Sequence, residues 1–154
     1  MEHIAQRDWS GLLHGSIPLT AAMGVGAQVE GDGRVRLKVP LHLNHNDKGT
    51  GFGGSVATLA TLAGWVEVRR QLDIADVGEA VEIVVQRGQL HYLLPINADF
   101  SALVDLPDPA TLARFVRLFA RAGLARLPLT AAVCCQGEVC ARFDGEFVAR
   151  RTQL

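Results

Sequence analysis

Residues 53–66 read Gly-Gly-Ser-Val-Ala-Thr-Leu-Ala-Thr-Leu-Ala-Gly-Trp-Val, and no charged side chain occurs between Val56 and Val66. A helix that is apolar on every side belongs in the interior of a protein. The many small side chains let other elements pack closely against it from several directions. The sequence therefore predicts a buried central helix over about residues 55–72.

The segments around this helix alternate apolar and polar residues, a pattern typical of strands with one solvated face. It predicts a hairpin of residues 25–29 and 35–39, and further strands at 80–94, 100–106, 129–136 and 139–148. Additional helices are predicted near 2–15 and over 109–127, the second capped by Asp108 with Pro109 at its first position. About six strands joined by short turns favour an α+β fold, in which a curved antiparallel sheet wraps the central helix.

Length and composition predict one domain over residues 1–154, with 49% hydrophobic residues against 20% charged ones. This apolar excess favours a large face buried against a second copy. The net charge of −1, with only two lysines, gives no indication of nucleic-acid binding. No apolar run approaches the roughly 18 residues of a membrane span, so we expect a cytoplasmic protein without a membrane partner.

Three cysteines, at 134, 135 and 140, lie in one apolar stretch and are expected to be reduced, buried side chains. They lack a nearby base, which makes a cysteine nucleophile a minor option. The five histidines are distant from them in sequence, so a metal site has no support.

The loop before the central helix contains the glycines of a Gly-x-Gly-x-x-Gly pattern, from Gly49 to Gly54. A dinucleotide-binding fold is rejected, because that motif needs a hydrophobic strand leading into the first glycine and a series of βαβ units. A P-loop is excluded because the lysine precedes the glycines. What remains is a helix start whose backbone N–H groups, at Gly53, Gly54 and Ser55, suit an oxyanion. The alternative is that the glycines only form a tight turn.

Residues 46–55 read Asn-Asp-Lys-Gly-Thr-Gly-Phe-Gly-Gly-Ser and resemble the active-site loop of hotdog-fold acyl-CoA thioesterases. The chain more closely resembles thioesterases of the YiiD C-terminal domain type, in this loop, in residues 62–65 and in the run His-Tyr-Leu-Leu-Pro at 91–95. The resemblance covers nearly the whole chain. It implies a hotdog fold and a homodimer, or a dimer of dimers, with sites at the interface. It also implies hydrolysis of an acyl thioester, on coenzyme A or on an acyl carrier, without a cofactor.

The resemblance also implies roles for single residues. Asn46 would orient the water or the thioester, and the N–H groups of Gly53 and Gly54 would polarise the thioester carbonyl. Phe52 stands where many relatives have His, and Thr61 stands where better-known thioesterases have an acidic base or nucleophile. This chain therefore needs another base, or it is a poor hydrolase.

Candidates for that base are Asp47, ranked first because dimerisation would desolvate its carboxylate and raise its pKa, and His45. Thr61 from the partner subunit would then position the water. Ordinary turn formation explains Asp47 and His45 at least as well. For Thr61 and its neighbour Thr58, a hydrogen bond back to the helix carbonyl four residues earlier is the favoured alternative.

Other side chains are candidates for substrate binding, either at the helix start or as guanidinium groups for the phosphates of coenzyme A. For the arginines of the 109–127 helix a solvated face is the favoured interpretation, while Arg69 and Arg70 are placed at the exposed end of the central helix. The full set is Phe52, Ser55, Thr58, Arg69, Arg70, Arg114 and Arg117.

Two other functions stay open. A non-catalytic acyl-thioester binding or regulatory domain would explain why Phe52 and Thr61 replace the usual His and carboxylate. An acyl dehydratase would need a catalytic His with an acid in the pocket, and only His45 is close to the motif.

Overall fold

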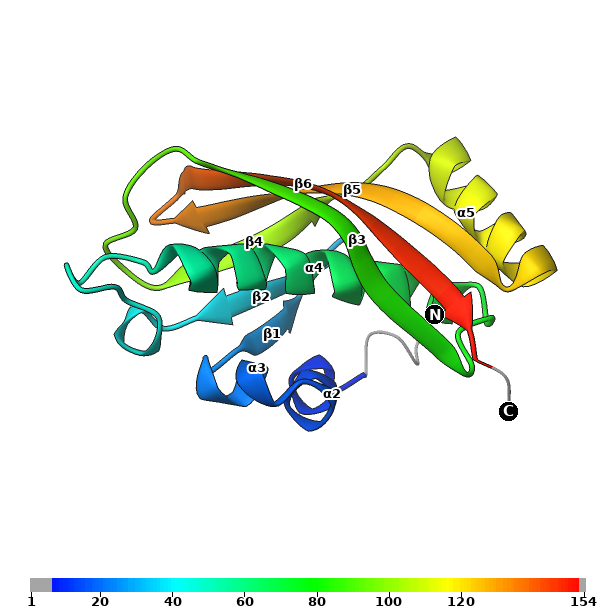
Figure 1. Ribbon diagram of the computed structural model, residues 1–154, viewed down its shortest axis with the longest axis horizontal. Helices are drawn as coiled ribbons and strands as arrows, with labels where there is room; N and C mark the ends of the chain where they lie inside the picture. The colour runs from blue at the N-terminus through cyan, green and yellow to red at the C-terminus, as the bar shows by residue number, and fades with distance from the viewer. Residues whose placement is uncertain (1–6, 153–154) are drawn as a thin grey trace.

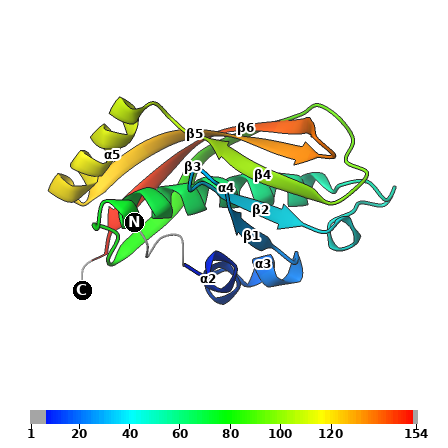
Figure 2. The same cartoon turned by 180° about the vertical axis from the view of Figure 1, so that it is seen from behind.

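The computed structural model describes residues 7–152 and has one six-stranded antiparallel sheet in the order β1-β2-β4-β5-β6-β3. The sheet curves over one long helix, as Figures 1 and 2 show from opposite sides. The predicted α+β architecture is therefore confirmed. The strands are β1 (Gly26–Val29), β2 (Val35–Val39), β3 (Val81–Tyr92), β4 (Phe100–Asp105), β5 (Leu124–Cys135) and β6 (Glu138–Arg151).

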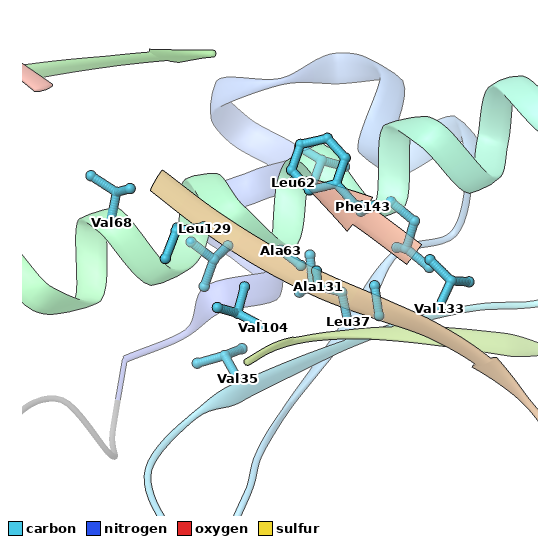
Figure 3. Close-up of a cluster of buried hydrophobic side chains, with 14 of the residues drawn as sticks. Val35, Leu37, Leu62, Ala63, Val68, Val104, Leu129, Ala131, Val133 and Phe143 are labelled. Atoms are coloured by element: carbon cyan, nitrogen blue, oxygen red, sulfur yellow. The ribbon is translucent and has the colours of Figure 1, made fainter. Parts of the chain in front are cut away.

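Helix α4 (Gly53–Ile74) is the predicted central helix and runs along the concave face of the sheet (Figure 1). Its buried side chains meet the inward-facing residues of β2, β4, β5 and β6, which alternate with outward-facing ones as strand geometry requires. In Figure 3, Leu62, Ala63 and Val68 of α4 lie in one cluster with side chains such as Leu129. Glycine is required at position 64, where α4 packs closely against β6, because a Cβ there would lie 2.2 Å from the ring of Phe147.

The prediction that α4 is enclosed on all sides is wrong for a single chain. A stripe of half-buried residues runs along it: Ala57, Thr58, Thr61 and Trp65. The stripe lies beside β3, where the indole N–H of Trp65 donates to the carbonyl of Ile83 at 3.2 Å. Since β3 is the last strand of the sheet, nothing in residues 7–152 continues the cover beyond it.

The remaining helices are α2 (Trp9–Ser16), α3 (Pro18–Ala22), the short 3-10 helix η1 (Leu41–Leu43) and α5 (Pro109–Ala122). The helix predicted near 2–15 matches α2 in its second half, and its first residues lie outside those described. In α5 the Asp108 carboxylate accepts the N–H of Thr111 at 2.9 Å, which confirms the predicted cap.

The predicted helix end at 127 is wrong. Gly123, with a φ of 66°, ends α5 in the left-handed conformation, and β5 begins at the next residue. Glycine reaches this conformation without steric cost, so it is the common residue after a helix C-terminus. Ala125 and Leu127 then alternate with exposed neighbours on the inner face of the sheet. They are strand residues, because their burial has a period of two.

Three polar side chains of α4 are buried together. Glu67 accepts hydrogen bonds from the guanidinium of Arg70 at 2.8 and 2.9 Å and from the amide of Gln71 at 2.7 Å. Arg70 is only 6% exposed, so the expectation that it lies at an exposed helix end is wrong. Because its guanidinium is already paired inside the protein, we assign Arg70 a structural role.

Candidate active site

The loop that leads into α4 is held by Asn46. Its carboxamide oxygen accepts the backbone N–H groups of Lys48 at 2.9 Å and Thr50 at 3.2 Å, and its amide donates to the Thr50 hydroxyl at 2.8 Å. The N–H of Asn46 also donates to the carbonyl of Thr50 at 2.7 Å. The structure thus places Asn46 within the loop turn, where all these hydrogen bonds shape the backbone.

Two glycines of this loop lie close to neighbouring side chains. At Gly51 a Cβ would lie 2.9 Å from the Cβ of Ile96, and at Gly54 it would lie 2.4 Å from the ring of Phe52. Phe52 itself is 53% exposed. Its ring therefore covers the second residue of the helix while one side of it remains open to solvent.

The first turn of α4 carries unpaired backbone donors. The N–H of Gly51 donates to Ile96 at 2.8 Å and that of Phe52 to Asn44 at 2.7 Å, whereas those of Gly53, Gly54 and Ser55 have no acceptor within residues 7–152. No side chain of the described residues caps this helix start. Because the positive end of the helix dipole lies at the same place, the site suits a negatively charged or polarised oxygen.

An apolar cleft of about 500 Å³ opens beside these donors. Among its walls, Leu93 and Leu94 are about half exposed, which makes them available to an apolar ligand. The residues that line the cleft are Gly51, Gly53, Val56, residues 92–96 and Cys140.

Cys140 is the only thiol of the cleft wall, and burial raises its pKa, with the nearby Cys135 adding to the effect. A raised pKa keeps the thiol protonated, which is the inert form of cysteine. This agrees with the prediction that the cysteines are buried, apolar side chains, although Cys134 is half-buried. No three His, Cys, Asp or Glu side chains in the described part of the chain lie close enough together to hold a metal ion.

The two candidate bases lie on the outside of the loop and do not line this cleft. The Asp47 carboxylate is 79% exposed and contacts Lys48 at 3.1 Å. The His45 ring contacts the carbonyl of Asn46 at 2.8 Å and lines a separate hollow of about 590 Å³, together with His42 and Asp99. A single chain therefore brings neither side chain to the helix start.

Thr58 and Thr61 each donate a hydrogen bond to the helix carbonyl four residues earlier, as the favoured interpretation predicts. The Thr58 hydroxyl donates to the carbonyl of Gly54 at 2.8 Å, and that of Thr61 donates to Ala57 at 2.9 Å. Ser55 is half-buried at the helix start. Thr61 lies on the half-buried stripe of α4, on the side that faces away from the core.

The remaining candidate arginines are far from the cleft. Arg69 pairs with Asp73 at 3.0 Å near the C-terminal end of α4, about 24 Å along the helix from Gly53 at the usual rise per residue. Arg114 and Arg117 are exposed on α5, at the opposite end of the molecule from the start of α4 (Figure 1). Neither makes an ion pair with another described residue.

Two larger hollows lie away from the helix start. One, of about 660 Å³, lies at the ends of β2, β4 and β5 next to Arg36 and Lys38, and the other, of about 980 Å³, lies between Asp76 and Arg151. None of the predicted site residues lines either of them. The smaller cleft beside Gly53 is therefore the better candidate, since it combines unpaired donors with an apolar wall.

Tyr92 belongs to this site, and sequence reasoning missed its role. Its hydroxyl donates to the carbonyl of Gly53 at 2.8 Å, and its ring lines the cleft. The tyrosine lies 39 positions from Gly53, and only the folded chain brings β3 and the start of α4 together. The sequence contained one signal, the His-Tyr-Leu-Leu-Pro run.

Solved structures with the same fold cover almost the whole chain. A protein from Shewanella oneidensis described as a "putative thioesterase" is 28% identical, with a TM-score of 0.80 over 99% of this chain and 100% of that one. A protein of unknown function from Chlorobaculum tepidum is 27% identical, with a TM-score of 0.83 over 98% and 94%. A Bacillus halodurans protein solved with CoA is 22% identical, with a TM-score of 0.64 over 96% and 89%. The predicted hotdog fold is confirmed.

No curated protein matches the chain. None of the helices in residues 7–152 has the length and apolar character needed to cross a membrane. A family model described as "Putative thioesterase (yiiD_Cterm)" matches residues 7–151, which confirms the resemblance seen in the loop. The protein therefore belongs to the YiiD C-terminal thioesterase family.

Proposed function

We propose that this protein is a cytoplasmic enzyme of lipid metabolism that hydrolyses acyl thioesters, with acyl-CoA as its substrate. The observation that carries the proposal is the start of α4, where three backbone N–H groups have no acceptor in the described chain and the first of these residues, Gly53, lines an apolar cleft. An acyl thioester has the matching chemistry, because it combines a carbonyl oxygen with an apolar chain.

The donors would act on the thioester carbonyl. Attack by water converts that carbonyl into a tetrahedral species whose oxygen carries negative charge, and the N–H groups of Gly53 and Gly54 would stabilise it. Removal of one such donor from an oxyanion hole costs about 3–4 kcal/mol of transition-state stabilisation. The acyl chain would lie along Leu93 and Leu94, which are already exposed on the cleft wall.

Activation of the water would require a second copy of the chain. The half-buried stripe of α4 lies beside the edge strand β3, which fits a homodimer in which the stripes and edges of two copies meet. Thr61 of one copy would then position water at the helix start of the other. Asp47 remains the first candidate for the base and His45 the second, since burial in a dimer would remove either from solvent.

Coenzyme A would extend from the cleft along the surface. A relative of the same fold, from Bacillus halodurans, was solved with CoA. Guanidinium groups suit phosphate, and Arg114 and Arg117 are exposed with no acidic partner among the described side chains. Because α5 is distant from the cleft of its own chain, these arginines would serve the site of the second copy.

The test is release of free thiol from a panel of saturated acyl-CoAs by the purified protein. We expect turnover with at least part of the panel, and a fall in kcat when Asp47 is replaced by Ala. An unchanged rate in Asp47→Ala would remove Asp47 from the mechanism and leave His45. If the protein released no thiol from any acyl-CoA or from acyl carrier protein loaded with an acyl chain, this result would contradict the proposed hydrolysis.

One observation favours a second candidate, a non-catalytic domain that binds acyl thioesters. Among the described residues, none that line the cleft carries a carboxylate, and the Thr61 hydroxyl is already bonded to its own helix. Saturable binding of acyl-CoA by calorimetry, without any thiol release, would support this candidate. A dehydratase is not proposed, because His45 lies outside the cleft.

A further inference from the structure

We propose that Tyr92 is a positioning residue that fixes and polarises the peptide group carrying the Gly54 N–H. The inference rests on the proposed function, because it assigns Tyr92 a part in the same oxyanion hole. Its basis is one contact across the fold: the Tyr92 hydroxyl, at the end of β3, donates to the carbonyl oxygen of Gly53 at 2.8 Å.

The carbonyl of Gly53 and the N–H of Gly54 belong to one peptide group. That group is planar, with its oxygen and its hydrogen on opposite sides, so a bond that holds the oxygen also sets the direction of the N–H. This constraint matters at this position because two glycines follow one another, and glycine has the greatest backbone freedom of any residue. Tyr92 thus restrains the peptide group between Gly53 and Gly54, where the two glycines give the backbone the most conformational freedom.

The same contact makes the donor stronger. A carbonyl that accepts a hydrogen bond polarises its peptide group, and the effect strengthens the bond made by the N–H, by about 10–30% in condensed-phase estimates. In the proposed reaction that gain would be largest when the thioester oxygen becomes an anion. Tyr92 would therefore act on the transition state more than on the bound substrate.

The backbone around Tyr92 is held firmly enough for this role. Tyr92 pairs with Ala141 of β6, and the N–H groups of Leu93 and Leu94 both donate to the carbonyl of Cys140, at 2.8 and 3.1 Å. The hydroxyl also lies against the α-carbon of Gly53, since a Cβ there would be 3.2 Å from the Tyr92 oxygen. Tyr92 thus connects the end of β3, which β6 holds in place, to the start of α4.

The test compares Tyr92→Phe, which removes only the hydroxyl, with Thr130→Val, which removes a hydroxyl from an exposed site on β5. We expect Tyr92→Phe to lower kcat for octanoyl-CoA about two- to eightfold with KM unchanged, since a transition-state interaction is weakened. The control should retain wild-type rates. Thermal unfolding of both variants should stay close to that of the wild type, because Tyr92 is 58% exposed.

A second readout does not need turnover. In 15N-labelled protein the Gly54 amide nitrogen should move upfield in Tyr92→Phe and stay in place in Thr130→Val, since only the first variant loses the bond to the Gly53 carbonyl. Turnover with an unchanged kcat, or an unmoved Gly54 signal, would overturn the role of Tyr92 and leave the proposed function standing. A moved Gly54 signal in a protein that hydrolyses no acyl-CoA would instead overturn the proposed function, and with it any catalytic effect of Tyr92.

Discussion

Gly54 is the residue of the candidate site at which a Cβ would come closest to a neighbouring side chain, 2.4 Å from the ring of Phe52. In Gly54→Ala the new methyl group would push the ring of Phe52, which is the far end of a flexible, exposed side chain. We therefore expect the fold to survive and the ring to move across the helix start. Thiol release from acyl-CoA should fall by about tenfold or more, an effect smaller than the 100- to 1000-fold cost of losing an oxyanion donor.

Gly15→Ala is the matched control for this prediction. Gly15 lies in α2, and a Cβ there meets no atom within 4 Å. Replacement of a helical glycine by alanine stabilises a helix by about 0.8–1 kcal/mol, so this variant should unfold at a slightly higher temperature and keep its activity. Equal activity loss in both variants would show that the effect at Gly54 is not local to the site.

Single residues also show how far sequence reasoning reaches. The glycines and the free N–H groups could be predicted, because helix starts have fixed donors whatever the tertiary structure. The roles of Tyr92 and Arg70 could not be predicted, since each depends on a contact that the sequence does not encode locally. In the sequence, Arg70 is a charged residue near the predicted end of a helix. The folded structure shows that it is buried and pairs with the carboxylate of Glu67.

At the scale of elements, the buried Glu67–Arg70 pair determines how α4 tolerates substitution. Removal of one partner leaves an unpaired charge in the interior, which typically costs about 3–5 kcal/mol. We expect Glu67→Met to lower the free energy of unfolding by that amount in a urea titration. The double variant E67M/R70M should recover most of the loss, with a residual cost of about 1 kcal/mol for the unpaired Gln71 amide.

Equal destabilisation in the single and double variants would contradict this view of the pair. The loss would then come from the space that the side chains fill rather than from the charge.

The cap of α5 makes a prediction about pH. The backbone N–H of Thr111 donates to the Asp108 carboxylate and lowers its pKa below the ordinary value. A lowered pKa in the folded state contributes stability that is complete above the unfolded pKa of about 3.9 and disappears as the pH falls through the folded pKa. Asp108→Ala should therefore lower the Tm by a few degrees at pH 7 and by much less near pH 2.

The Asp144→Ala variant, at an exposed position of β6, is the control for this measurement. Its carboxylate pairs with the exposed Arg87 at 2.7 Å, and such surface pairs contribute little to stability. A difference between wild type and Asp108→Ala that stays the same at both pH values would rule out the carboxylate as the source of the stabilisation.

Most element boundaries follow from the sequence, and the largest deviation, at the start of β5, has a physical reason. The run after Gly123 is apolar enough to continue a helix, but the alternation of Ala125 and Leu127 with exposed neighbours belongs to a strand. A short apolar run does not distinguish the two periods. Gly123 is the one local signal that the helix ends there.

At the scale of the whole molecule, the half-buried stripe of α4 and the free edge of β3 predict self-association. Sedimentation should give a mass of at least twice the 16.5 kDa of one chain. Val85→Lys should shift the population toward the monomer, because Val85 is 43% exposed and the alternation of the strand places it on the side of α4. Val84→Lys, on the opposite face of the same strand, should leave the mass unchanged.

A mass near 16.5 kDa for the wild type at micromolar concentration would contradict both the dimer and a site shared between two copies. If both lysine variants sedimented as monomers, the contact between the two copies would involve both faces of β3 rather than only the face on the side of α4.

The exposed edge of β3 also affects the solubility of the monomer, before two copies associate. Twelve residues of extended backbone end the sheet, and nine of them are exposed. Such an edge is a template on which any extended polypeptide can add a strand, and this is the usual route to aggregation. Dimer formation would thus protect solubility as well as complete the site. A variant that cannot pair should then precipitate or depend on chaperones, unless its edge also carries new charge.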